Sequence, residues 1–501
     1  MIKKILISSL ILNLALLIGR LSGFVRELIV AKTYGVSAAA DIVVLWLTLP
    51  DLLLNILAGS AIGAALIPGF VANEEKAKVI WFQAILAALI GSLTISVVLQ
   101  FFSISIVSLL APGISPVSLD LADYGVKVAI FIFPLSLLVA VNSAYFHYEG
   151  KFFMAGIGTL VFNGVLIVGL LLCGYFYIED LKLILIAVFL AAFVRFFYQF
   201  LVVFDRGALI GLFERNYISK EVVVRFLQAM MSSGVIFVYP VIGRSFSSAA
   251  GEGGVAMFNY MFKLIELPLM VAVTFLSVVF MPSLAKAWVV DKRDYLSLAI
   301  RGIELTLFTA IFVMLPVWIY SDVYVKMVYG AVLDNVSLVV IAESVKLGSL
   351  ILISQGSIIF LSSVFNSAGS TRVPLFANLF AVALFVMLLK IFGVSRMDYI
   401  VRCLVMSQFV GLLIMALLFV RRWFGSFGGI VSCRWFVAIL LAPTLIICLD
   451  YALQAESELL RTSIIMPVYM AAGMYAALSH PVLKAYLKKV LGKISRGKFR
   501  V

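Results

Sequence analysis

The sequence predicts an all-α polytopic membrane protein, and two observations carry that prediction. Of its 501 residues, 64% are hydrophobic and only 13% are charged, whereas a soluble protein carries about 25% charged residues. Apolar stretches of the roughly 20 residues that a helix needs to cross the hydrocarbon core recur from Ile5 to Leu483, with short polar breaks between them. No long polar insertion leaves room for a nucleotide-hydrolysing or glycosyltransferase domain.

Turns and charged residues divide the chain into about fourteen membrane spans of suitable length. The break from Asp205 to Glu221 mixes charged and apolar residues, which is typical of a linker on the cytoplasmic membrane surface. It separates six predicted spans from eight. The spans are expected near residues 5–31, 37–71, 79–110, 124–146, 152–175, 183–204, 222–247, 255–284, 296–319, 341–367, 374–393, 399–420, 436–453 and 463–483.

Lysines and arginines are concentrated on one side of these spans. Lys3 and Lys4 precede the first span, and a basic tail from Lys484 to Arg500 follows the last. The positive-inside rule therefore places both termini in the cytoplasm, with the first span as an uncleaved helix. The net charge of +13 reflects this topology rather than nucleic-acid binding. The four cysteines show no paired spacing, so neither a metal site nor a disulfide framework is expected.

A weak internal repeat relates the beginning of the first six spans to the beginning of the next eight. Inverted or parallel repeats of this kind are typical of transporters. One constant offset superposes four features of the first two spans on their later counterparts: Arg26 on Arg244, Gly35 on Gly253, Asp41 on Asn259, and Leu49-Pro50 on Leu267-Pro268.

Charged side chains inside the predicted spans point to a binding site, because each costs roughly 2.5 to 3.5 kcal/mol near the bilayer centre. Their cations outnumber their acids, so a cleft lined by the first and eighth spans would be electropositive. Such a cleft suits a phosphate or diphosphate, which arginine binds through two parallel hydrogen bonds. The set consists of Arg20, Arg26, Glu27, Arg244, Lys263 and Glu266.

These charges also admit a structural interpretation. Arg26 with Glu27, and Lys263 with Glu266, can form ion pairs that brace the helices, and Arg20 can extend to the membrane interface. Charged residues at other positions near or inside the spans are assigned mainly to interfaces and packing: Arg195, Glu343, Lys346 and Arg402.

Glycines and prolines mark candidate hinges. Gly19 and Gly23 allow the first span to bend or a neighbouring helix to approach closely. Prolines are expected to interrupt the second and eighth spans and so to make them moving parts. They are Pro50, Pro68, Pro268 and Pro282.

Three segments carry a family resemblance. They are GRLSGFVRELIVAKTYGVSAAADIVVLWLTLPDLL from Gly19, NYMFKLIELP from Asn259 with the following FMPSLAKAW, and FNSAGSTRVP from Phe365. They resemble, in order, the opening of the MurJ (MviN) family, its eighth helix, and its connection between the tenth and eleventh helices. This family comprises the lipid II flippases of the MOP transporter superfamily.

The resemblance implies an organisation for the whole chain. Residues 1–206 would form an N-lobe of six helices, and residues 207–221 a cytoplasmic linker. Residues 222–424 would form a C-lobe of six helices. Residues 425–501 would form two helices with a groove for the prenyl tail of a lipid, followed by the basic cytoplasmic tail.

It also implies roles for individual residues. Arg20 and Arg26 match essential arginines of the family's first helix, and Asp41 matches an acidic position at the start of the second. Lys263 occupies a position that is usually arginine, and Glu266 matches an acidic residue. With Arg244, these form the predicted substrate-binding set, while Gly19, Gly23, Pro50 and Pro268 are the predicted hinges.

The function implied is that of a flippase in the bacterial inner membrane, a transporter rather than an enzyme. It would move lipid II to the periplasmic leaflet by alternating access, without a cofactor, and an ion gradient, the membrane potential or consumption of the product outside would supply the energy. Lipid II or a related polyprenyl-diphosphate glycan and membrane lipids are the expected partners, and cell-wall synthesis proteins are candidate partners.

Other functions stay open, either because the sequence departs from the family's pattern or because another class of membrane protein could share its features. The family's basic pair after the Leu-Pro step is replaced here by Leu54 and Asn55, so a paralog that moves another lipid-linked glycan stays open. A multidrug or small-cation antiporter of the same superfamily would need an acidic or aromatic cavity. An enzyme acting on polyprenyl substrates would need clustered catalytic groups, whereas the acids of the predicted outward loops are isolated: Asp322, Asp334, Glu456 and Glu458.

Overall fold

The described part of the chain is all-α, as expected: its regular elements are helices. This computed structural model describes residues 2–56, 62–175, 181–204, 207, 209, 213–214, 216–394 and 396–423. The chain separates into two compact units. Unit 1 comprises Met1–Leu267, Asp322–Gly348 and Leu375–Ser407, and unit 2 comprises Pro268–Ser321, Ser349–Pro374 and Gln408–Val501. The predicted division into N-lobe, linker, C-lobe and C-terminal pair stays a prediction.

The described residues form eighteen α-helices. In chain order they are α1 (Ile2–Tyr34), α2 (Ala38–Ile56), α3 (Ile62–Ala72), α4 (Ala77–Gln100), α5 (Ser103–Leu110), α6 (Pro116–Tyr148), α7 (Phe152–Tyr175), α8 (Lys182–Val203), α9 (Lys220–Gly234), α10 (Val238–Ser247), α11 (Gly254–Pro268), α12 (Phe275–Val290), α13 (Lys292–Ile319), α14 (Ser321–Tyr329), α15 (Asn335–Gly348), α16 (Ile351–Ser367), α17 (Arg372–Phe392) and α18 (Met397–Trp423).

Eight of the described helices are long and apolar enough to cross a membrane, or nine when one bent pair is counted as a span. This confirms the polytopic membrane class. The count of fourteen stays a prediction, because the spans expected at 436–453 and 463–483 lie outside the described residues, and several others are divided into shorter helices.

Two predicted spans are broken at positions that carry no proline. The span expected at 79–110 divides at Phe101 and Phe102, where the Phe101 N–H turns back to the carbonyls of Val98 and Leu99 and closes α4. The span expected at 341–367 divides into α15 and α16, which are bent by 42°. That bend falls at Gly348 and Ser349, a glycine–serine pair of the kind that kinks helices.

Of the four prolines expected to interrupt helices, three do not. Pro50, Pro68 and Pro282 lie inside α2, α3 and α12, which continue through them. A membrane helix tolerates a proline when neighbouring groups satisfy the freed carbonyl. Pro268 agrees with the expectation, because α11 ends there and a π-helical turn from Leu269 to Thr274 follows.

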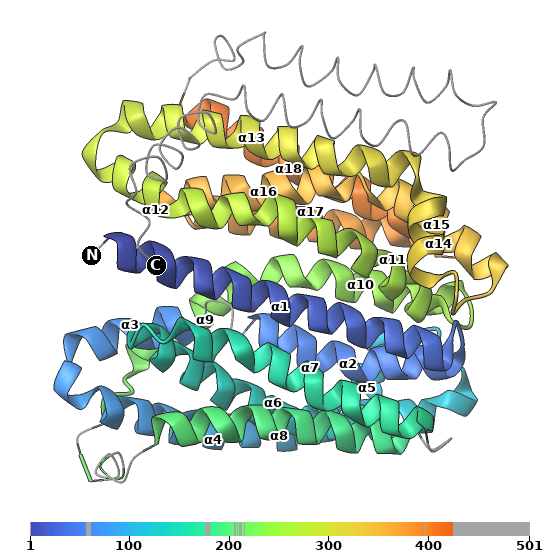
Figure 1. Cartoon of the computed structure of the whole chain (residues 1–501), viewed down its shortest axis with the longest axis horizontal. Coiled ribbons are helices and arrows are strands. Elements are labelled where there is room, and N and C mark those ends of the chain that lie inside the picture. Colours follow the sequence, from blue (N-terminus) through green and yellow to red (C-terminus); the bar gives the residue numbers. More distant parts are fainter. Residues whose placement is uncertain are drawn as a thin grey trace, which may run out of the picture. The chain divides into compact units, whose positions relative to one another are not determined.

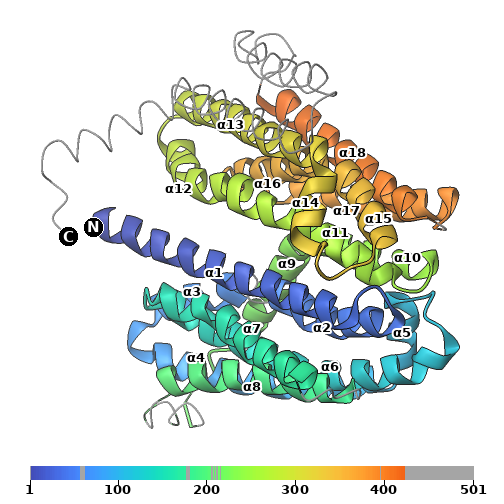
Figure 2. The same cartoon turned by 45° about the vertical axis from the view of Figure 1, so that its right-hand side comes forward.

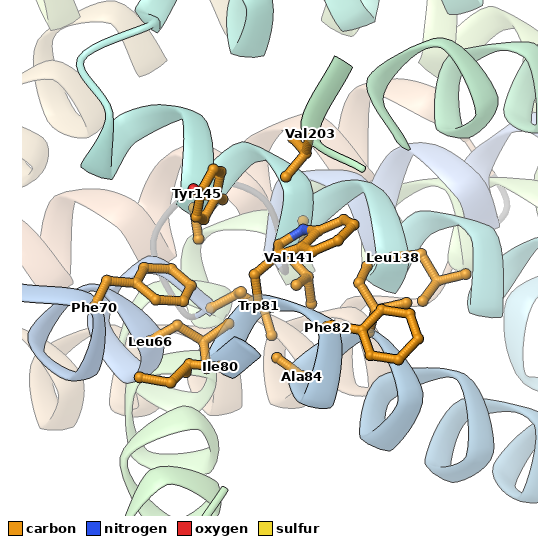
Figure 3. Close-up of a cluster of buried hydrophobic side chains, with 14 of the residues drawn as sticks. Leu66, Phe70, Ile80, Trp81, Phe82, Ala84, Leu138, Val141, Tyr145 and Val203 are labelled. Carbon is orange, nitrogen blue, oxygen red and sulfur yellow. The ribbon is translucent and has the colours of Figure 1, made fainter. Parts of the chain in front are cut away.

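An aromatic core joins α3, α4, α6 and α8 within unit 1 (Figure 3). Trp81 is fully buried at its centre, and its indole N–H donates to Asn142 Oδ1 at 2.9 Å. Phe70 packs edge-on against Tyr145, with ring centroids 5.5 Å apart. Because buried aromatic rings remove a large apolar area from water or lipid, this cluster fixes the scaffold on which α1 and α2 lie.

Helix α1 lies alongside α7, which in turn packs on α8; the two views show the same order (Figures 1 and 2). Gly19 makes the α1–α7 approach possible, since a Cβ there would lie 3.0 Å from Thr159 Cβ. At Gly23 it would lie 3.3 Å from Asn163 Nδ2. Both glycines were expected to allow bending or close approach, and they do the latter; a hinge role stays a prediction.

At Gly125, α6 packs closely against α2, and replacing this glycine gives a testable prediction. A Cβ at this position would lie 1.8 Å from Nε1 of Trp46, which is fully buried in α2. Gly125→Ala should therefore lower the free energy of unfolding by about 1 to 3 kcal/mol, through forced separation of α2 and α6. A thermal melt of the purified protein measures the effect. Gly91→Ala in α4 is the matched control, because a Cβ there meets nothing within 4 Å, and equal melting of both variants would contradict the packing argument.

Candidate functional site

The site begins with two adjacent charges buried in α1. Arg26 and Glu27 are each 2% exposed, and Arg26 Nη2 donates to Glu27 Oε1 at 2.6 Å. The same guanidinium also contacts α2: Nη2 lies 2.7 Å from Asp51 Oδ2, and Nη1 lies 3.3 Å from Asp51 Oδ1. Arg26 thus uses its planar fork on one carboxylate while a second carboxylate shares Nη2.

Asn163 of α7 orients Arg26 from the other side. Its Oδ1 accepts from Arg26 Nη1 at 3.3 Å, and its Nδ2 donates to Gly19 O at 3.1 Å and to Ser22 Oγ at 3.0 Å. The small residues of α1 let α7 come close enough for an amide to reach both the backbone and the guanidinium. Arg26 is therefore oriented by hydrogen bonds to residues of α1, α2 and α7.

The network continues into α10 and α11 through Asn259. Its Nδ2 donates to Glu27 Oε2 at 2.7 Å, and its Oδ1 accepts from Arg244 Nε at 3.1 Å. Arg244 Nη1 reaches Thr48 Oγ1 of α2 at 3.4 Å. The two arginines that the internal repeat superposes, Arg26 and Arg244, thus belong to one hydrogen-bonded network.

The internal repeat also superposes two glycines with positive φ, each in the connection between two helices. Gly35, between α1 and α2, has φ of 59°, and Gly253, between α10 and α11, has φ of 78°. Only glycine adopts this backbone conformation without strain. These two positions are therefore equivalent in conformation as well as in sequence.

Asp51 corrects the expected charge balance. The sequence argument set Arg20, Arg26, Arg244 and Lys263 against two acids, but Asp51 adds a third carboxylate that pairs directly with Arg26. The excess of cations is smaller than expected. A sequence signal for Asp51 existed, since a charge inside an apolar segment one residue after Pro50 is costly unless it is paired.

The remaining predicted cations lie near acids as well. Lys263 Nζ and Glu266 Oε2 are 2.8 Å apart on α11, and both side chains are about one-fifth exposed, at 20% and 24%. The ion pair expected from their spacing is confirmed. Arg20 is exposed on α1, and Glu266 acts on it electrostatically.

Asp41 has a structural role in this conformation. Its two carboxylate oxygens accept from the backbone N–H groups of Gly253 and Ala256, each at 2.8 Å, so it caps the start of α11. In return, Glu252 Oε1 accepts from Ala38 N at 3.2 Å at the start of α2. A carboxylate is stabilising at each of these helix N-termini, because it pairs with unsatisfied N–H groups.

The structure therefore brings Arg26 and Arg244 into one network and places Asp41 in a reciprocal cap. Contact of these residues, or of Arg20, Lys263 and Glu266, with a substrate stays a prediction. Sequence reasoning did not identify Asp51 or Asn163 as members of the network, and it marked Asn259 only through the repeat. Across the described ranges, no group of three or more histidine, cysteine or acidic side chains could hold a metal ion.

Comparison with known proteins gives the family. The family model described as "Lipid II flippase MurJ" matches residues 30–454. The chain belongs to this family. The resemblance carried by the three sequence segments is thereby confirmed.

Named relatives of the MurJ family agree over much of the chain. A protein of Buchnera aphidicola subsp. Acyrthosiphon pisum named "Probable lipid II flippase MurJ" is 25% identical over 392 residues, which are 74% of this chain and 75% of that protein. The "Lipid II flippase MurJ" of Burkholderia cenocepacia is 24% identical over 316 residues, 59% of this chain and 60% of that protein.

Solved structures agree on the fold. A lipid II flippase MurJ in an inward closed conformation has a TM-score of 0.79 at 17% identity and covers 96% of this chain and 99% of its own. An inward-facing multidrug resistance MATE transporter of the MOP superfamily has a TM-score of 0.69 at 15% identity, covering 82% of this chain and 97% of its own. At these identities the likeness concerns the fold alone, and it confirms the predicted MOP-type architecture.

Proposed function

We propose that this protein is a lipid II flippase that moves the undecaprenyl-diphosphate-linked peptidoglycan precursor from the cytoplasmic to the periplasmic leaflet of the bacterial inner membrane. Membership in the MurJ family and the printed names of its relatives support this substrate. The observation that carries it within the chain is the buried Arg26, whose guanidinium is held in a fixed orientation by three side chains.

The chemistry of the site suits a diphosphate. A guanidinium offers two parallel donors to a phosphate, and orientation by fixed neighbours lowers the entropy lost on binding. Arg20, exposed on α1, and Lys263, partly exposed on α11, are the accessible cations that first attract the headgroup. No bond is made or broken in such a step, so no catalytic group and no cofactor is needed.

Alternating access is the mechanism we propose for the movement. The prenyl tail stays in lipid while the headgroup crosses between helices, and the π-helical turn after Pro268 supplies a candidate hinge. Coupling to an ion gradient or to the membrane potential would supply energy. Both termini would lie in the cytoplasm, which leaves the basic C-terminal tail on the side where the precursor is made. Cell-wall synthesis proteins are proposed partners on either side.

A paralog function is the second candidate, and two sequence departures favour it. Lys263 stands where the family usually has arginine, and Leu54 and Asn55 replace a basic pair. Lysine keeps the charge but loses the planar fork. Both departures weaken recognition of a particular diphosphate-linked glycan while they leave the class of substrate unchanged.

Depletion of this protein in its own cells tests the proposal. Lipid II should accumulate, and it should stay inaccessible to an impermeant reagent added outside the cytoplasmic membrane. Re-expression should restore its exposure within one generation. Accumulation of a different polyprenyl-diphosphate glycan would favour the paralog function, whereas unchanged amounts of all such lipids would contradict both.

A further inference from the structure

Arg195 of α8 is a buried cation that the proposed binding set does not include. It is 4% exposed, and its Nε and Nη1 have no hydrogen-bond partner among the described residues. The helix opposite makes room for it: a Cβ at Gly158 of α7 would lie 3.0 Å from Arg195 Nε and 2.8 Å from Gln199 Nε2. Packing alone therefore does not explain this guanidinium.

A buried charge without a partner is expensive, so it normally faces an anion in at least one state of the protein. Besides the hydroxyl of Tyr198 beside it on α8, the group that stabilises the charge of Arg195 electrostatically is the carboxylate of Asp51. Helix α2, which carries Asp51, touches α8. Asp51 thus lies within the electrostatic reach of Arg195 as well as of Arg26, Lys263 and Arg244, and it hydrogen-bonds Arg26.

Asp51 also occupies the position that a substrate phosphate needs. Its two oxygens take the two donors of the Arg26 fork, at 2.7 and 3.3 Å. Its side chain is 29% exposed, whereas Arg26 is 2% exposed. The carboxylate is therefore the more exposed partner of the pair, and a diphosphate can bind Arg26 through this fork only after Asp51 has moved.

We propose that Asp51 is a displaceable counter-ion: the diphosphate of the substrate replaces it on Arg26, and Arg195 then receives the displaced carboxylate. This inference rests on the proposed function and deepens it. In the resting protein Asp51 keeps Arg26 neutralised and rigid. Arg195 lowers the cost of displacement, because the released carboxylate passes to a second buried cation instead of being left unpaired.

A double-mutant cycle on the full chain in lipid nanodiscs tests the exchange, with undecaprenyl diphosphate as the probe and undecaprenol as the uncharged control. Asp51→Asn should bind the diphosphate about tenfold more tightly, since it removes a charged competitor of the ligand. Arg195→Met should bind it about fivefold more weakly, because the displaced carboxylate loses its acceptor. The double variant should match Asp51→Asn, and Arg195→Lys should recover most of the wild-type affinity.

The outcomes separate the inference from the proposed function. Suppose that Arg26→Lys weakens binding of the diphosphate but Asp51→Asn binds it no more tightly than the wild type does. This result overturns the counter-ion role of Asp51 and leaves the anionic site standing. If Arg195→Met weakens binding equally in both backgrounds, Arg195 acts independently of Asp51 and the exchange is wrong. If neither the wild type nor Asp51→Asn prefers the diphosphate over undecaprenol, the anionic site fails and the proposed function fails with it.

Discussion

Arg26→Ala should abolish growth when this chain is the sole flippase of a cell depleted of its own. Two effects combine in this result. The diphosphate loses its two-donor partner, and Glu27 and Asp51 lose the cation that both contact. Removing one partner of a buried ion pair costs about 3 to 5 kcal/mol. The variant should therefore both fail to transport and melt at a lower temperature.

A neutralised network separates these two effects. Arg26→Met combined with Glu27→Gln and Asp51→Asn removes the cation together with both carboxylates that it compensates, and it leaves Asn163 in place. Replacing a whole buried ionic group by neutral residues is often tolerated. The triple variant should regain most of the thermal stability and still fail to support growth.

Arg26→Lys is the matched conservative change. It keeps the charge and loses the planar fork, so partial growth is expected with near-normal stability. Complementation assays and melting curves on the same membranes give both readouts. Full growth supported by Arg26→Ala, or recovery of growth by the triple variant, would exclude Arg26 as a substrate contact.

The membrane-protein class was predictable from composition, because a soluble protein does not have 64% hydrophobic and only 13% charged residues. The candidate cations were predictable one by one for a related reason: a charge inside an apolar span demands an explanation, and Arg26, Glu27 and Arg244 proved to be buried or linked in one network. Their partners could not be found in this way. Asn163 is far along the chain from Arg26, and a polar amide in the apolar α7 does not by itself indicate which charge it contacts.

The positions of the helix breaks were also only partly predictable from the sequence. Helix interruptions were expected at Pro50 and Pro282, yet α2 and α12 continue through these two prolines. The breaks between Gln100 and Ser103 and between Gly348 and Ile351 fall where the sequence has no proline. Local sequence reports the cost of a conformation, whereas packing against neighbouring helices decides whether that cost is met.

Asn259→Asp should be the second most damaging change in the network. Asn259 is 2% exposed and links its two halves as a donor to Glu27 and an acceptor from Arg244. A carboxylate at this position keeps the bond to Arg244. It also places two carboxylates at hydrogen-bonding distance, because its second oxygen replaces the Nδ2 that lies 2.7 Å from Glu27 Oε2 in the wild type. Two carboxylates that share a buried site cannot both ionise without a large penalty.

Glu27→Gln should rescue this variant, because the exchange restores the pattern of bonds. The new amide at position 27 can donate to the new carboxylate at position 259, while Arg26 keeps Asp51 as its anionic partner. The cycle of two single variants and the double variant should show a favourable coupling of about 2 kcal/mol in unfolding free energy. Transport should recover in parallel, if the network positions Arg26 and Arg244 as a unit. Additive losses would show instead that Asn259 acts on each arginine separately, and that the link between α1 and α11 has no bearing on how the two arginines are held.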